Sequence, residues 1–403
     1  MKMSAVQLKK AKEFLEEPLH SVYGMRKVNG EKYGVEFENE LPEAPLDDRT
    51  MEKVVYNTSF SIKNDGSLRL HGYEFVSKPQ EYQEMKDEIA KVCALVKDMP
   101  WTYSRRTSTH IHMNFSDKTA YEVLKFACTY WIIEPLLFMA VDPVRRSNSF
   151  CVSSSDTKWQ LRQAFEKFDL ARVFLEDQAK YASLNLCPLL NIQTVECRIF
   201  HSSWNVNEIH GWLDILHNMR HFAAIRQLDQ IKSDFMDLKP EAFCQLVIGQ
   251  KATGELKKAA ADGGANLDDL LREGYNAIRP LLGLSKKIKE VQGFFEEARQ
   301  EYERRKNLPP KPPRDDDPLA QLQWLEEDAK FAELRNLFEP PPPPDAQPAW
   351  RMFDLANGLW VEVQPPGPNP APAAHAVFDE AAEVLENVWN VIDDIDDDEV
   401  DPR

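Results

Sequence analysis

The chain has 403 residues, of which 43% are hydrophobic, so it is long enough and apolar enough for one large or two ordinary domains. Its net charge of −17 is unevenly distributed: residues 309–403 carry 22 acidic and 6 basic residues, whereas residues 1–308 carry 44 and 43. Neither part has the basic surface of a duplex-binding protein, which argues against a nucleic-acid partner.

Two further features exclude classes of protein. The N-terminus mixes Lys and Glu without an apolar core, so it is not a signal peptide. The most apolar stretch, residues 126–141, contains Glu134 and Pro135 and is too short to span a bilayer, so we expect a buried helix and no membrane partner. The six cysteines form no CxxC pair, which favours reduced thiols in the cytoplasm.

In chain order, the first 308 residues predict a mixture of strands and helices. The predicted strands are YGVEFENEL (33–41), VVYNTSFSI (54–62), SLRLHGYEFVS (67–77), HIHMNF (within 108–115) and TVECRIF (194–200). The predicted helices are 1–19, a segment opened by Pro79, 117–140, 157–179, 206–228 and the whole of 239–306.

The character of the chain changes at Leu308, where Pro-rich and acidic segments begin. Such sequences favour extended polyproline II and cannot bury a core, so we predict a domain over 1–308 and a largely disordered tail over 309–403. Short helices are predicted near 318–338 and 375–392. The second is amphipathic, which leaves open a protein partner for the tail as an alternative to simple solvation.

Three predicted strands place ionisable residues at every second position: Glu36 with Glu38, His110 with His112, and Glu196 with Arg198. Residues i and i+2 of a strand point to the same face, so each strand sends these groups to one side and its apolar groups to the other. Carboxylates and imidazoles suit divalent metals, and guanidinium groups suit phosphate or carboxylate. The pattern predicts a sheet whose polar face is a site.

Each motif also has an explanation without function. The glutamates could lie solvated on an edge strand, the histidines could be a hydrogen-bonded couple, and Glu196 with Arg198 could be an ion-pair ladder. Glu74 interrupts an aromatic strand, so it lies on an edge or has a partner. Arg145 and Arg146 could complement a helix dipole or clamp phosphate. Without a GxxxxGK[ST] motif, any bound nucleotide must be held by metals and side chains.

Read in order over about residues 30–230, the segments YGVEFE, GYEFVSKP, THIHMN, RRSNSF, KYASLN and TVECRIF resemble the phage-type amidoligases. These are carboxylate–amine ligases similar to glutamine synthetase and glutamate–cysteine ligase. The resemblance implies an α+β fold, in which a curved antiparallel sheet forms a cradle and helices pack on its back. The helical continuation over 231–308 would complete the domain.

The resemblance also implies a reaction. ATP and two or three Mg²⁺ ions would meet a small-molecule or peptide carboxylate, form an acyl-phosphate, and let an amine displace phosphate to give an amide. A cytoplasmic location follows, that of the host if the chain is phage-encoded.

By position in these motifs, Glu36, Glu38, Glu74, His110 and Glu196 are similar to the metal ligands of the family. Arg198 is similar to a phosphate contact, with His112 beside the metal-binding histidine, and either Arg145 or Arg146 would steady the transferring phosphoryl group. Two other functions compete with this one. They are a metal-dependent hydrolase that uses no nucleotide, and a non-catalytic interaction protein that acts through its acidic Pro-rich tail.

Overall fold

The structure, a computed structural model, describes residues 4–146, 148–153, 158–169, 180–307, 329–339, 350–354 and 359–363. The chain divides into two compact units, Met1–Phe338 and Glu339–Arg403.

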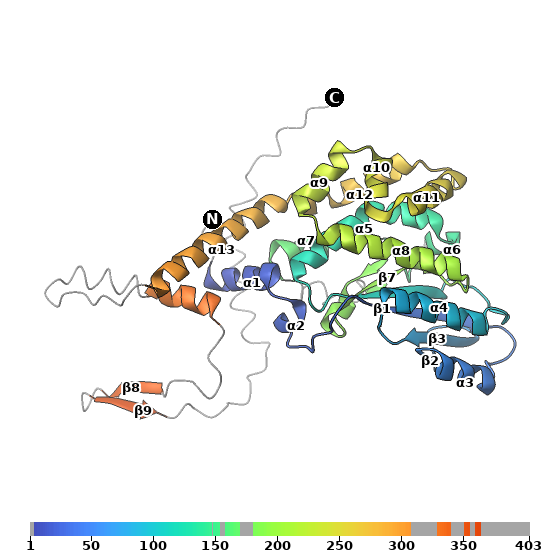
Figure 1. The fold of residues 1–403 in the computed structure, drawn as a ribbon, viewed down its shortest axis with the longest axis horizontal. Helices are drawn as coiled ribbons and strands as arrows, with labels where there is room; N and C mark the ends of the chain where they lie inside the picture. Colours follow the sequence, from blue (N-terminus) through green and yellow to red (C-terminus); the bar gives the residue numbers. More distant parts are fainter. Residues whose placement is uncertain are drawn as a thin grey trace. The chain divides into compact units, whose positions relative to one another are not determined.

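The first unit is built on an open, seven-stranded sheet in which every ladder is antiparallel (Figure 1). The strand order is β2-β3-β1-β5-β7-β6, and the short β4 pairs with the start of β1. The strands are β1 (Lys32–Leu41), β2 (Phe60–Asn64), β3 (His71–Ser77), β4 (Gln80–Glu81), β5 (Ser108–Asn114), β6 (Leu184–Asn185) and β7 (Thr194–His201). The predicted class, an antiparallel sheet combined with helices, is confirmed.

One face of the sheet is apolar and is covered by the helices α4 (Tyr82–Val96), α5 (Ala120–Ala140) and α8 (Val206–Ala224). Tyr33 of β1 packs edge-on against Tyr82 of α4, with ring centroids 5.9 Å apart, and its hydroxyl lies 2.8 Å from Nδ1 of His217 on α8. On β7, the Cys197 thiol lies 3.5 Å from the Tyr130 hydroxyl of α5. The helices therefore hold one side of β1, β5 and β7 in place and leave the other side for polar residues.

Further helices surround this arrangement, with α12 packed on α5 and α10 beside α8 (Figure 1). They are α1 (Ala5–Glu16), α2 (Leu19–Val22), α3 (Asp48–Asn57), α6 (Pro143–Arg146), α7 (Lys158–Glu166), the 3₁₀ helix η4 (Cys187–Leu190), α9 (Leu228–Asp237), α10 (Pro240–Ile248), α11 (Gln250–Asp262), α12 (Leu267–Leu282) and α13 (Ser285–Lys306).

Helix α5 is the apolar segment that the sequence marks most strongly. By length and composition it could cross a membrane, but 78% of its most apolar window is buried inside the protein. Its N-terminus is fixed by a capping box, in which Thr119 and Glu122 satisfy each other's backbone N–H groups. The prediction of a buried helix here is confirmed.

The prediction of a strand over residues 54–62 is wrong in its first half, because residues 54–57 end helix α3 and β2 begins only at Phe60. Asp47 caps α3 by accepting a hydrogen bond of 2.9 Å from the backbone N–H of Thr50. Val55 and Tyr56 are exposed, so their strand propensity finds no sheet surface to pack against and the cap decides the conformation.

Several predicted helices have different limits in the structure. Helix α7 ends at Glu166, and residues 170–179 of the helix predicted over 157–179 lie outside the described residues. The region 239–306 is four helices, α10 to α13. Residues 329–338 are helical, whereas 318–328 and the helix predicted over 375–392 lie outside the described residues.

In the second unit the structure describes a two-stranded antiparallel hairpin that the sequence did not predict. Strand β8 (Trp350–Asp354) pairs with β9 (Leu359–Val363), and Trp350 lies opposite Val363. The hairpin lies in the segment that the sequence assigns to a disordered tail.

Candidate active site

The three strands with alternating ionisable residues are direct neighbours in the order β1, β5, β7. The register places Glu36 opposite His110 and His112 opposite Glu196. Paired residues in an antiparallel ladder point to the same face, so these side chains gather on the face that α4, α5 and α8 leave open. The sheet thereby joins three motifs that the chain separates by more than seventy residues each.

The centre of this cluster consists of Glu36, His110 and Glu196. Nδ1 of His110 lies 3.4 Å from a Glu36 oxygen and 3.2 Å from a Glu196 oxygen. One ligand atom from each of the three residues lies within 4.8 Å of the others, a spacing that could hold a metal ion. The His110 side chain is only 1% exposed, whereas that of Glu36 is 23% exposed, so the cluster is reached from the Glu36 side.

A second carboxylate on β1 extends the cluster. Glu38 lies 3.5 Å from Nε2 of His110, and the Ser108 hydroxyl hydrogen-bonds to Glu38 while lying 2.8 Å from the same imidazole nitrogen. Glu74 on β3 is directly opposite Glu38, and Lys63 of β2 is opposite Glu74. Glu74 therefore lies on the same face as the cluster, at its margin.

The other side of the cluster is organised around Glu196. Its Oε2 accepts a hydrogen bond of 2.6 Å from the Asn185 side-chain amide, and its Oε1 accepts one of 2.5 Å from Arg198. His112 lies 3.3 Å from the Glu36 carboxylate and 3.0 Å from the Thr194 hydroxyl through its other ring nitrogen. These contacts fix both imidazole rings in orientation.

Arg198 follows Glu196 by two residues on β7 and so points to the same face, and the β5–β7 ladder is irregular just beyond it. Thr109 pairs with Phe200 and Ile111 with Cys197, so His110 alone faces two residues of β7, Arg198 and Ile199. Such bulges re-aim side chains and are common beside active sites.

Of the doubled arginines, only Arg145 belongs to the cluster. Its side chain is 1% exposed, and its Nη2 donates a 2.5 Å hydrogen bond to the carbonyl oxygen of Arg198. Its Nε and Nη1 have no hydrogen-bond partner among the described residues, and neither does Nε of Arg198. Arg146 is exposed and donates to the carbonyl of Met139, so it lies apart from the cluster.

The carboxylates at the centre are held ionised. Burial alone would raise the pKa of Glu36, but hydrogen bonds with His110 and His112 outweigh it and hold this pKa well below its ordinary value. Burial likewise opposes ionisation of Glu196, and the charge of Arg198 together with both histidines lowers its pKa. At the margin, burial and the nearby Glu36 raise the pKa of Glu74, and the charge of Lys63 offsets this only in part.

This donor set fits a divalent cation. Carboxylate oxygens are the ligands that Mg²⁺ prefers, and here four carboxylates share one face of the sheet with the guanidinium of Arg198. Arg145 of α6 adds a second guanidinium, which bonds to the carbonyl oxygen of Arg198. The unused N–H donors of Arg145 and Arg198 are the complement of an anion rather than of a metal. The arrangement therefore provides for metal and for an anionic group side by side.

Sequence reasoning missed three supporting residues: Ser108, Asn185 and Thr194. Ser108 could have been found, because it lies in phase with His110 and His112 on the same strand. Thr194 could likewise have been found, because it lies in phase with Glu196 and Arg198 on β7. Asn185 carries no such signal, since only the pairing of β6 with β7 brings it to the cluster. A second group, Glu31 with His217 and His221, also escaped notice, although the one-turn spacing of its histidines is visible in the sequence.

An open antiparallel sheet with a buried face of carboxylates, imidazoles and guanidinium groups defines a mixed α/β protein with an enzyme-like polar site. The chain belongs to the family described as "Putative amidoligase enzyme", which matches residues 15–219 and so includes β1, β3, β5 and β7. The predicted family is thus confirmed, and with it the class of the enzyme, a ligase. No curated protein shows significant similarity to the chain.

Proposed function

We propose that the protein is an ATP- and Mg²⁺-dependent ligase that joins a carboxylate to an amine through an acyl-phosphate. The observation that carries this proposal is the buried guanidinium of Arg145 and the half-buried one of Arg198, both with unused donors, beside an oxygen-rich cluster in a chain of the amidoligase family. Phosphoryl transfer depends mainly on positioning and charge neutralisation. The carboxylates of this cluster would position magnesium, and its guanidinium groups would neutralise phosphate charge.

The residues suited to hold magnesium are Glu36, Glu38 and Glu196, with Glu74 at the margin and His110 between them. Bound magnesium would neutralise the phosphate charge of ATP. The low pKa of Glu36 and of Glu196 keeps these ligands ionised at neutral pH without a prior proton loss. His112 contacts the Glu36 carboxylate and Asn185 donates to that of Glu196, so these two residues orient the metal ligands.

Arg198 and Arg145 would bind the γ-phosphate through their unused N–H groups. The substrate carboxylate attacks the γ-phosphorus, the bond to the bridging oxygen of ADP breaks, and an acyl-phosphate forms. The amine then attacks the acyl carbon, inorganic phosphate leaves, and the nitrogen loses a proton. The two arginines stabilise charge that develops on the transferring phosphoryl oxygens.

The proposal also covers the type of fold, the substrates, the cellular location and the role of the tail. We interpret the open sheet as the cradle of the glutamine synthetase-like ligases, with the carboxylate and amine substrates being small molecules or peptides. The proposed location is the cytoplasm, where ATP is available. The acidic tail is proposed to bind a protein partner.

Two measurements on the full chain test the ligase reaction. Mg²⁺ with a non-hydrolysable ATP analogue should raise the melting temperature of the wild type, because a ligand of the native state stabilises it. With ATP, Mg²⁺ and a panel of carboxylates, hydroxylamine should intercept the acyl-phosphate as a hydroxamate while ADP is released.

Glu36→Gln and Arg198→Ala should each lower ADP release by about 100-fold or more, since each removes a charged contact to the transition state. Glu255→Gln, on an exposed position of α11, is the control and should match the wild type. ADP release that persists unchanged in folded Glu36→Gln or Arg198→Ala would overturn the proposal. Stabilisation by Zn²⁺ or Mn²⁺ alone that is lost in Glu36→Gln, with no response to nucleotide, would indicate the hydrolase instead.

A further inference from the structure

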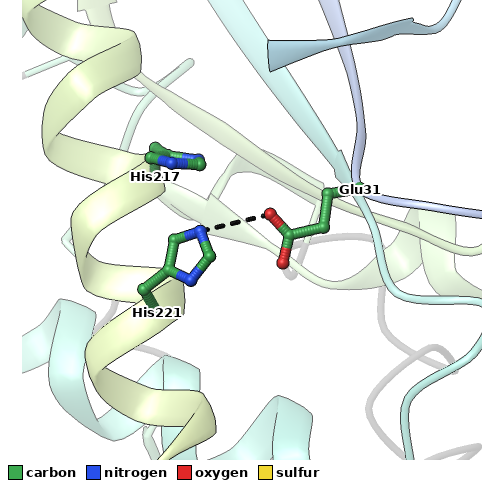
Figure 2. Close-up of side chains that lie close together, drawn as sticks. All are labelled: Glu31, His217 and His221. Atoms are coloured by element: carbon green, nitrogen blue, oxygen red, sulfur yellow. Dashed lines mark ion pairs between the residues drawn. The ribbon is translucent and has the colours of Figure 1, made fainter.

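A second group of metal-type ligands lies on the helix-covered side of β1, separate from the polar face. His217 and His221 are one turn apart on α8, and Glu31 immediately precedes β1 (Figure 2). One ligand atom from each of the three residues lies within 4.8 Å of the others. Nε2 of His221 lies 3.2 Å from Oε2 of Glu31. Two imidazoles at this helical spacing with one carboxylate from another segment form a recurrent ligand set for zinc.

His217 is held in position by contacts that leave it able to bind an ion. Its ring stacks on Tyr82, with centroids 3.8 Å apart and planes 13° apart, and its Nδ1 lies 2.8 Å from the Tyr33 hydroxyl. Metal binding through Nε2 requires a proton on Nδ1, and the Tyr33 hydroxyl oxygen supplies the acceptor for it. Oriented imidazoles of this kind are the usual outer support of metal ligands.

Glu31 is supported from the other side. Its Oε1 lies 3.7 Å from Nε of the buried Arg220, while Oε2 is directed to His221. The guanidinium of Arg220 is also placed over the ring of Phe115, 5.0 Å from its centroid, which holds its charge beside the carboxylate. The charge of Arg220 thus lies on the Oε1 side of Glu31, and Oε2 is left on the side of the histidines.

The position is accessible from solvent. The His221 side chain is 54% exposed and that of Glu31 is 39% exposed, so an ion can enter without rearrangement of the core. Three protein ligands leave a fourth position for water. Imidazole ligands favour zinc and related transition ions over magnesium, which distinguishes this group from the oxygen-rich polar face.

We propose that Glu31, His217 and His221 form a binding site for a divalent transition ion, with Zn²⁺ as the expected ion. The site joins the segment that leads into β1 to helix α8. It does not depend on the ligase reaction, because its residues belong neither to the polar face nor to its supporting contacts.

Zinc titration of the full chain by calorimetry, with Mg²⁺ in excess, tests the site. The wild type should bind zinc with a dissociation constant in the micromolar range, and binding should raise its melting temperature. His221→Ala should weaken this binding by at least about tenfold, as should Glu31→Gln, which keeps the shape of the side chain and removes its charge. His71→Ala, which removes an exposed histidine on β3, should leave binding unchanged.

Glu196→Gln separates this site from the polar face, because it alters the other candidate cluster and should leave this zinc equivalent in place. Wild-type zinc stoichiometry and affinity in both His221→Ala and Glu31→Gln would overturn the proposal. So would the loss of the same equivalent in Glu196→Gln, since the ion would then belong to the polar face. Circular dichroism verifies that each variant is folded.

Discussion

Arg145 is buried although only part of its guanidinium group is paired. A buried guanidinium normally has most of its five donors filled, because leaving them unpaired costs free energy of folding. Here Nε and Nη1 have no partner among the described residues, and burial lowers the pKa of this side chain. Residues that reduce stability in this way are concentrated at functional sites. Arg146, one position later, is exposed and has no such cost.

This difference predicts opposite outcomes for stability and activity. Arg145→Met should lower ATP-dependent ADP release by about 100-fold or more, because a charge at the phosphoryl group is lost. Its melting temperature should stay at the wild-type value or rise, since a buried charge with two unpaired nitrogens is replaced by an apolar chain. Thermal unfolding and an ADP-release assay on the same preparation measure both effects.

Arg146→Met is the matched control and should keep both the activity and the melting temperature. If Arg145→Met were strongly destabilised but fully active per folded molecule, Arg145 would be a structural residue. The assignment of the phosphate contact to Arg145 would then fail.

At the scale of elements, the alternation of ionisable residues was sufficient to identify the polar face. Glu36, His110 and Glu196 could be predicted to point to one side of their strands because the strand period is two. The bulge opposite His110 could not be predicted, since it depends on how β7 pairs with β5 rather than on the residues of β7 alone. The error over Val55 and Tyr56 has a similar origin, because Asp47 outside the apolar run decided the conformation.

The packing of α12 on α5 depends on Gly274. A Cβ atom at this position would lie 2.4 Å from the carbonyl oxygen of Ile132 and 2.5 Å from that of Trp131. Both neighbours are backbone atoms in the middle of the buried helix α5, so they cannot turn aside. The glycine therefore allows the two helices to approach closely, and its cost in helix propensity is offset by this contact.

Gly274→Ala should therefore destabilise the protein by about 3 kcal/mol, as expected for overpacking against a rigid backbone. Gly254→Ala, in α11, is the control: a Cβ there meets nothing within 4 Å, so alanine should stabilise the protein by about 1 kcal/mol through helix propensity. Urea unfolding of the two variants measures both values. Equal stability of Gly274→Ala and the wild type would show that α12 can shift away from α5.

At the scale of the whole molecule, composition and packing place the end of the first unit differently. The change to Pro-rich sequence at Leu308 is readable from composition alone, whereas the compact unit extends to Phe338. The helical residues 329–338 pack on α13: Tyr302 lies 5.8 Å from Phe331 and 5.6 Å from Phe338, ring centroid to centroid. The sequence could not indicate this contact, because the aromatic residues lie beyond a segment that reads as a linker.

Local sequence signals explain why the polar face could be predicted and the group of Glu31, His217 and His221 could not. The polar face was recognised because each of its strands carries its own signal. Glu31 carries none, and only the packing of α8 beside β1 brings it to His217 and His221.

The extent of the first unit predicts the effect of shortening the chain. A chain that ends at residue 338 should melt at the temperature of the full chain, whereas one that ends at 307 exposes Tyr302, which is 3% exposed in the structure. Each lost aromatic pair is worth about 1 kcal/mol, so the shorter chain should melt lower by several degrees. Phe338→Ala in the full chain should also lower the melting temperature, because it removes the contacts with Tyr302 and Arg299. Phe294→Ala, at a partly exposed position of α13, is the control and should have less effect. Differential scanning calorimetry of the full chain and these four variants decides the point. Identical melting of the chains ending at 307 and 338 would mean that the compact unit ends with α13, at the boundary that composition predicts.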